Sequence, residues 1–482
     1  MSPVLHIAAN ELRLMARARV AQLAIALVVI LSAVAALTAI SQGRESQEIR
    51  SRFQAQADRE FDGQPARHPH RMVHYGHFVF RPLPALAGFD PGVDAFTGST
   101  LFLEGHRQNS ANFGDVRQSS LLVRFGQLTP AFVIQALGPL VLIFLGFGAI
   151  ARERDSGLLR LHFTQGVRAG QVVLGKAAAL SVVAGLILAP ALGALAWLTL
   201  VGGAAPVAAL TLAAGYAAYL LVWVLATTSI SALAPSSRTA LASLVAAWAL
   251  SAILAPRLAT DIALLAAPQP TRLETDIAIQ RDLKKIGDSH NPDDPHFNAF
   301  RASVLKTYGV ARVEDLPVNY RGLIAMEGER LTSSLFERYA ERQFADQRRQ
   351  SGMALALGLV SPTLAVRSLS MAASGTDLEG HRRFLRQAEA YRYAIVQRLN
   401  RLQAERLTFS DDSKRNSDPE AGRRVRIDPG AWRQTPDFVY RPASTSEALG
   451  AATPGLLLLG GWLALAGGLA WAASRRLERA GA

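Results

Sequence analysis

The chain has 482 residues, of which 50% are hydrophobic and only 18% are charged, and its formal net charge is +13. A soluble protein of this length rarely has this composition, because apolar residues would then cover its surface. The basic residues are spread along polar segments without forming a tract typical of a nucleic-acid-binding arm, so no nucleic-acid partner is expected. There is no cysteine, so a thiol nucleophile is excluded.

Six nearly uncharged stretches predict transmembrane helices, because roughly 20 apolar residues cross a ~30 Å hydrocarbon core. They are residues 20–40, 130–150, 177–201, 206–232, 239–265 and 448–473. The first is longer than a signal-peptide core of ~7–15 residues, so it predicts an uncleaved anchor. A seventh apolar stretch, residues 353–366, is short at about 14 residues and is interrupted by Ser361-Pro362, which favours an interfacial or buried helix.

Lysine and arginine in the short connections predict the orientation, since these residues are enriched on the cytoplasmic side of membranes. They gather in the N-terminal tail, between the second and third spans, after the fourth span and in the C-terminal tail. With six spans, all four places lie on one side. The sequence therefore predicts a multi-pass protein with both termini in the cytoplasm.

Two long polar segments then fall outside, and the expected fold is a mainly α membrane protein. Its two extracytoplasmic insertions would form a mostly helical domain with a small β contribution. The predicted divisions are 1–40 (cytoplasmic N-terminus and first span), 41–129 (first insertion), 130–265 (spans two to five, with a cytoplasmic loop at 151–176), 266–447 (second insertion) and 448–482 (sixth span and cytoplasmic tail).

Local patterns in the two insertions predict individual elements. A helix in the second insertion is indicated by apolar residues three and four apart, namely Phe384, Ala388, Tyr391, Ile395, Leu399 and Leu402. In the first insertion, residues 73–81 predict a short strand. The polar residues 411–426 predict a loop.

Sites for cofactors or catalysis are not predicted. Residues 170–176 approach a phosphate-binding loop, but Ala177 stands where Ser or Thr is needed to hold magnesium, and the stretch enters a span. No nucleotide is therefore expected on this chain. The zinc-protease and serine-hydrolase patterns are absent, so no catalytic residue is predicted.

Five histidines crowd the first insertion: His68, His70, His74, His77 and His106. Histidine clusters can hold copper or zinc. Here cysteine support is lacking and the spacing matches no tight zinc signature, so structural or surface roles are favoured over a metal site.

The loop at 151–176 opens with a charge cluster closed by a glycine, Arg152-Glu153-Arg154-Asp155-Ser156-Gly157-Leu158-Leu159, and closes with Leu174-Gly175-Lys176. Placed between spans two and three, it resembles the coupling helix of ABC-2-type permeases, the membrane subunits of one class of ATP-binding-cassette transporter. That family often has Glu-Gly-Thr-Leu where this chain has Asp155-Ser156-Gly157-Leu158.

The outer insertions resemble those of a bacterial subgroup with a large extracytoplasmic domain between spans five and six. The similar elements are His74-Tyr75-Gly76, Phe89-Asp90-Pro91-Gly92, Leu103-Glu104-Gly105-His106, Ser361-Pro362 and Ser374-Gly375-Thr376-Asp377.

The resemblance implies a non-enzymatic permease subunit in a bacterial inner membrane, surrounded by lipid and moving an unidentified substrate. It implies that ATP and magnesium are held by a separate ATPase subunit, and that the permease pairs with a second copy or a sister permease. The residues implied to couple to the ATPase are Arg152, Glu153, Arg154, Asp155, Ser156, Gly157, Leu158 and Leu159. Alternatively, these charges merely anchor the loop. An extracytoplasmic scaffold or sensor without transport activity is the rival function; a polytopic enzyme and a secondary transporter are less favoured.

Overall fold

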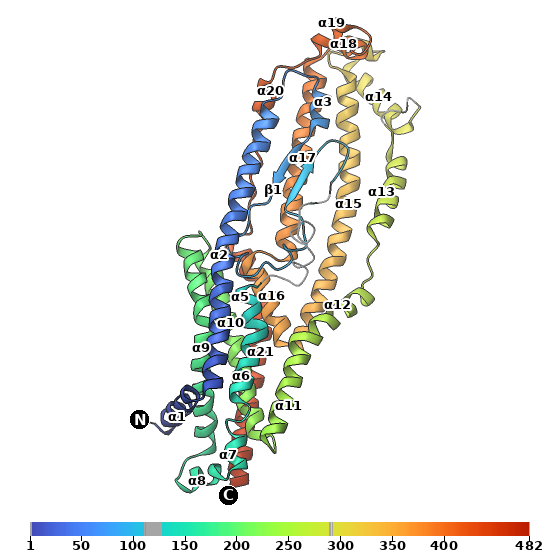
Figure 1. Cartoon of the computed structure of the whole chain (residues 1–482). Coiled ribbons are helices and arrows are strands. Elements are labelled where there is room, and N and C mark those ends of the chain that lie inside the picture. Colours follow the sequence, from blue (N-terminus) through green and yellow to red (C-terminus); the bar gives the residue numbers. More distant parts are fainter. Residues whose placement is uncertain (1, 110, 112–127, 289–290, 292, 482) are drawn as a thin grey trace.

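The computed structural model describes residues 2–109, 111, 128–288, 291 and 293–481 (Figure 1). These residues are mainly helical, and the two strands among them form one antiparallel sheet. Six helical stretches are long and apolar enough to cross a membrane, and each contains nearly all of one predicted span. They are Arg19–Asp62, Pro130–Asp155, Ala169–Leu200, Pro206–Leu233, Ser237–Ala266 and Thr445–Arg479.

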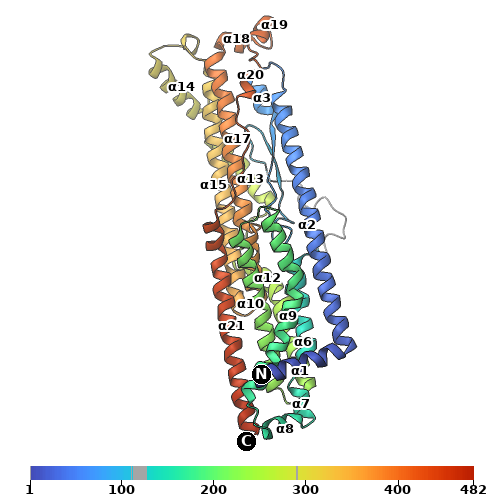
Figure 2. The ribbon, with the colours of Figure 1, turned by 90° about the vertical axis from the view of Figure 1, so that its left-hand side faces the viewer.

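The molecule is elongated, with the apolar helices gathered at one end and a second group of helices extending away from them (Figures 1 and 2). We call the first part the apolar bundle. It contains α1 (Pro3–Arg17), the first half of α2 (Arg19–Asp62), α5 (Pro130–Phe132), α6 (Gly138–Gly146), α7 (Ala151–Asp155), α8 (Leu158–Thr164), α9 (Ala169–Leu200), α10 (Pro206–Leu233), α11 (Ser237–Trp248), α12 (Ala255–Ala266) and α21 (Thr445–Gly481).

We call the second part the distal domain. Besides the second half of α2, it contains α3 (Pro69–Tyr75), β1 (His77–Phe80), β2 (Thr100–Leu103), α13 (Arg272–Ile286), α14 (Pro295–Tyr308), α15 (Tyr320–Ala356), α17 (Leu378–Arg406), α18 (Phe409–Lys414), α19 (Pro419–Arg424) and α20 (Gly430–Arg433). Helix α2 belongs to both parts, since its 44 residues are roughly 66 Å long at 1.5 Å per residue.

The core of the distal domain follows the predicted stripe. Phe384, Ala388, Ile395 and Leu399 are all buried along α17, which packs against α15 and α3. Strands β1 and β2 pair with His77 opposite Leu103. The predicted helix is therefore confirmed, and its apolar face is the face that the neighbouring segments cover.

Two local predictions are wrong in part. Residues 73–75 belong to α3 rather than to a strand, because Pro69 begins that helix and the strand starts only after Gly76, whose φ is 76°. The segment 411–426 contains α18 and α19 rather than a plain loop. Both helices are capped, by the side chains of Thr408 and Asp418.

The short apolar stretch at 353–366 is divided between α15 and α16 (Pro362–Ser374), which begins at the Ser361 cap. The stretch is not one of the six spanning-length helices. Helix α16 is buried against α10 and α21. Gly455 permits this approach, because a Cβ there would lie 2.8 Å from the Leu369 Cβ. The prediction of a buried helix holds for α16.

Candidate functional site

The predicted coupling segment forms two short helices, α7 and α8, between α6 and α9. They lie at the end of the apolar bundle farthest from the distal domain, near α1 and the last turns of α21 (Figure 1). Gly157 joins them with φ 78° and ψ −5°. A Cβ there would meet nothing within 4 Å, so the left-handed backbone, rather than a lack of space, favours glycine.

Glu153, the first acidic residue of the segment, is held by a buried lysine. Lys176 Nζ lies 2.5 Å from Glu153 Oε1 and 2.6 Å from Glu11 Oε2, and the lysine side chain is 3% exposed. One cation therefore ties α1, α7 and α9 together. The stretch that resembled a phosphate-binding loop lies in α9 as continuous helix, so it offers no loop to cradle a phosphate.

The next two charges hold α7 to the turn between α10 and α11. Arg154 donates hydrogen bonds to the carbonyls of Ala232 and Ala234. Asp155 accepts a hydrogen bond from the Ser237 hydroxyl at 2.8 Å and one from the Ser237 amide at 3.2 Å. Glu153, Arg154 and Asp155 thus have partners within the chain. Their contact with another subunit stays a prediction.

The exposed residues of the segment include two leucines and two arginines. Leu158 and Leu161 are 50% and 53% exposed, and Arg152 and Arg160 are exposed as well. Leu159 is turned inward at 5% exposure and packs with residues of α9, α10 and α21. Of the eight predicted coupling residues, five are exposed: Arg152, Asp155, Ser156, Gly157 and Leu158. Leu161 lay outside the predicted set, although its spacing of three from Leu158 indicated a shared helix face.

A polar network that the sequence did not reveal lies where the bundle meets α16. Gln135 donates to the Tyr216 hydroxyl at 2.7 Å, and Tyr216 donates to Ser370 Oγ at 2.9 Å. The Tyr219 hydroxyl donates to the Gln135 carbonyl at 2.7 Å and lies 3.0 Å from Thr363 Oγ1. Gln135 belongs to a π-helical turn, Val133–Leu137, a feature frequent at functional sites. This network links the second and fourth spans to the buried helix below the distal domain.

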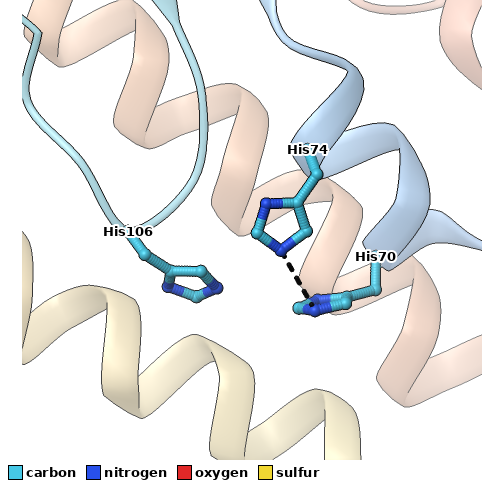
Figure 3. A group of neighbouring side chains, drawn as sticks. All are labelled: His70, His74 and His106. Carbon is cyan, nitrogen blue, oxygen red and sulfur yellow. Dashed lines mark hydrogen bonds between the residues drawn. The ribbon is translucent and has the colours of Figure 1, made fainter.

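The structure separates the histidines of the first insertion into two groups. His68 Nε2 lies 3.0 Å from Asp412 Oδ1, and His77 Nε2 lies 3.0 Å from Asp58 Oδ1, so both have structural partners. His70, His74 and His106 instead gather together (Figure 3). Burial, helped by the neighbouring charges of His74 and His106, lowers the pKa of His70 to about 4. That imidazole is therefore neutral at pH 7.

A buried arginine, Arg392, contacts this histidine group indirectly, through Glu329. Arg392, whose side chain is 2% exposed, lies 2.6 Å from Glu329 Oε1 and makes two hydrogen bonds to Glu389, at 2.7 and 2.8 Å. Burial alone would raise the pKa of Glu329. Hydrogen bonds from His106 and the charge of Arg392 outweigh it, so the pKa of Glu329 is held below its usual range.

The fold and composition define a mainly α-helical, multi-pass membrane protein. A family described as "Domain of unknown function (DUF3526)" matches residues 272–441, which run from the start of α13 to just before α21. A search of curated proteins gives no match.

Proposed function

We propose that this chain is the permease subunit of an ABC-2-type transporter and that the α7–α8 segment docks on a separate ATPase subunit. The observation that carries the proposal is the exposure of Leu158 and Leu161 on α8, together with the exposed Arg160 on the same helix. Exposed apolar side chains rimmed by charge are typical of a protein-binding surface. The resemblance of the sequence to ABC-2-type coupling helices supports the same assignment.

The anchoring contacts explain how such a surface could move membrane helices. Lys176 links α7 to α9, whereas Arg154 and Asp155 link it to the α10–α11 turn. A force applied to α8 would therefore act through α7 on α9, α10 and α11 together, instead of only bending the loop. ATP-driven closure of the ATPase would in this way bias a permease dimer between two access states.

The proposal also places α7 and α8 in the cytoplasm and the distal domain outside the inner membrane. The chain has no cysteine, so single cysteines can report the two sides without background. Ser156 and Ser413 are both exposed, the first between α7 and α8 and the second on α18. With a membrane-impermeant maleimide on spheroplasts, we expect Ser413→Cys to react and Ser156→Cys to react only after permeabilisation. The reverse pattern would reject this orientation.

Docking on the ATPase is tested by replacing the exposed apolar side chains of α8 with charged ones. We expect the chain, purified in mild detergent from its native membrane, to carry a P-loop ATPase identifiable by mass spectrometry and to hydrolyse ATP. The double variant Leu158→Glu/Leu161→Glu should lose both, since charges replace the apolar contacts. Gln165→Glu is the matched control, because it adds a charge to an exposed position on the same loop.

A membrane-anchored extracytoplasmic scaffold is the alternative, which the long continuous helix α2 favours. The same purification separates the two functions. A wild-type chain that never carries an ATPase, or a double variant that keeps as much ATPase as wild type, would favour the scaffold.

A further inference from the structure

Three imidazole rings from two separate segments converge on the distal domain (Figure 3). His70 and His74 come from α3, and His106 comes from the connection after β2. One ring nitrogen from each lies within 4.8 Å of those from the other two. The ring centroids are 4.7 Å apart for His70 and His74, and 5.9 and 5.5 Å from these rings to that of His106.

Helix α3 fixes the first two rings. Residues four apart share a helix face, so His70 and His74 stand one above the other. The His68 side chain accepts a hydrogen bond from the His70 amide at 3.1 Å and caps the helix. The Nε2 atoms of His70 and His74 are 3.3 Å apart. Two nitrogens bound at ~2.05 Å to one tetrahedral ion are also about 3.3 Å apart.

The third ring is held by an unusual backbone. His106 has φ 63°, the one positive value outside glycine among the described residues. Gly105, just before it, donates a hydrogen bond to the Val73 carbonyl at 3.2 Å, and a Cβ on Gly105 would lie 2.2 Å from Val73 Cγ1. Strained backbone of this kind persists where surrounding contacts impose it, often at functional sites. Here it brings His106 against α3.

Glu329 orients His106 in the manner of a carboxylate behind a metal-bound histidine. Its Oε2 accepts the His106 amide at 3.1 Å and lies 3.4 Å from Nδ1 of the same residue. A proton on Nδ1 facing this carboxylate leaves the Nε2 lone pair free for a metal ion. Glu329 cannot turn away, because Arg392 holds its other oxygen at 2.6 Å.

The surroundings are electrostatically mixed and open to solvent. The charges of Glu104 and Glu329 oppose that of Arg107 at His74, and the charge of Arg415 acts on His70. The His74 ring is exposed, and the His106 side chain is 32% exposed. An ion could therefore enter, and a fourth ligand position would face water.

We propose that His70, His74 and His106 bind one divalent ion of the late first-row transition metals, with three imidazole nitrogens as ligands and an exchangeable fourth position. Imidazole suits zinc, copper and nickel, whereas calcium and magnesium require oxygen ligands. A shift of the His106 ring by about 1.5 Å or less completes a tetrahedral set. The ion would cross-link α3 to the connection after β2.

The test uses the full chain in detergent, purified with a histidine-free tag and stripped of metal by a chelator. We expect about one Zn²⁺ bound per chain, competed by Cu²⁺ and unaffected by excess Mg²⁺. Co²⁺ should give the intense visible bands of a four-coordinate nitrogen site. His74→Ala, at an exposed position, should remove this binding and the spectrum, and Glu329→Gln should weaken it about 10–100-fold.

His296→Ala is the matched control, since His296 is a distal-domain histidine whose side chain is 40% exposed and is paired with Glu327. It should bind as wild type does. The absence of stoichiometric binding to the wild-type chain would overturn the proposal, as would equal binding by His74→Ala that retains the wild-type melting temperature. An octahedral Co²⁺ spectrum would also contradict it. None of these results depends on an ATPase partner.

Discussion

The apolar bundle and the distal domain each contain a buried cation between two carboxylates, and the two arrangements differ in what they hold. Lys176 binds Glu11 and Glu153, which come from α1 and the short helix α7. Arg392 binds Glu329 and Glu389, which come from the long helices α15 and α17. Lys176 therefore fixes α7, a short helix with few buried residues. Arg392 instead joins α15 and α17, which already pack against each other.

The chemistry of the two cations fits this difference. A guanidinium presents several donors in a rigid plane, and Arg392 also donates to the Glu104 carbonyl at 3.1 Å. The lysine ammonium is a point charge on a flexible stem, and its bonds allow the attached segments to reorient. The rigid contacts of Arg392 suit the support of a ligand site. The more flexible contacts of Lys176 suit a docking segment that changes position.

The largest effect is expected at Arg392. Arg392→Ala leaves Glu329 and Glu389 without their buried partner, and breaking such a pair costs about 3–5 kcal/mol. The free energy of unfolding of the distal domain, measured by denaturant titration in detergent, should fall by that amount. Arg401→Ala, at an exposed position on the same helix, should change it by less than about 0.5 kcal/mol. Equal losses would remove the special role of Arg392.

A smaller and more local effect is expected at Lys176. Lys176→Met should loosen α7 without unfolding the bundle, because the apolar core of α9 remains. Trypsin cleavage at Arg152, Arg154 and Arg160 should accelerate about tenfold or more, equivalent to about 1.4 kcal/mol of local closing free energy. Adding Glu11→Gln and Glu153→Gln should restore part of the protection, since no unpaired carboxylate then remains buried. Unchanged cleavage in Lys176→Met would show that the lysine does not anchor the loop.

An effect similar in size to that at Lys176, but confined to one turn, is expected at Gly157. Gly157→Ala places a Cβ on a residue with φ 78°, which costs roughly 1–2 kcal/mol and shifts the turn between α7 and α8. Thermal stability should fall slightly, and ATPase co-purification should fall with it. Gly170→Ala, within α9 and with open space around it, should be neutral or stabilising. A loss at Gly170 equal to that at Gly157 would refute the backbone explanation.

The features that could be predicted from the sequence are those set by residues close to one another along the chain. The six apolar stretches and the stripe from Phe384 to Leu399 follow from periodicity and length, and the structure contains them. Pairing across the chain was not predictable, because it depends on packing. Lys176 reaches Glu11, 165 positions away, and no sequence pattern indicated this pair.

The same limit applies to the two candidate sites. Composition singled out the histidines, but only the course of the chain after β2 separates His106 and its two partners from His68 and His77. In the loop, Leu159 is buried and Leu158 is exposed, because adjacent residues of a helix such as α8 point in directions about 100° apart. A charge pattern could indicate the loop but not which of its residues face outward.

Site-specific photo-crosslinking tests the central claim most directly. A photoreactive amino acid at position 158, on the exposed face of α8, is compared with one at position 413 on the distal domain, both in the native membrane. We expect a crosslink from position 158 to a P-loop ATPase and none from position 413. No ATPase adduct at 158, or equal adducts at both positions, would contradict this claim.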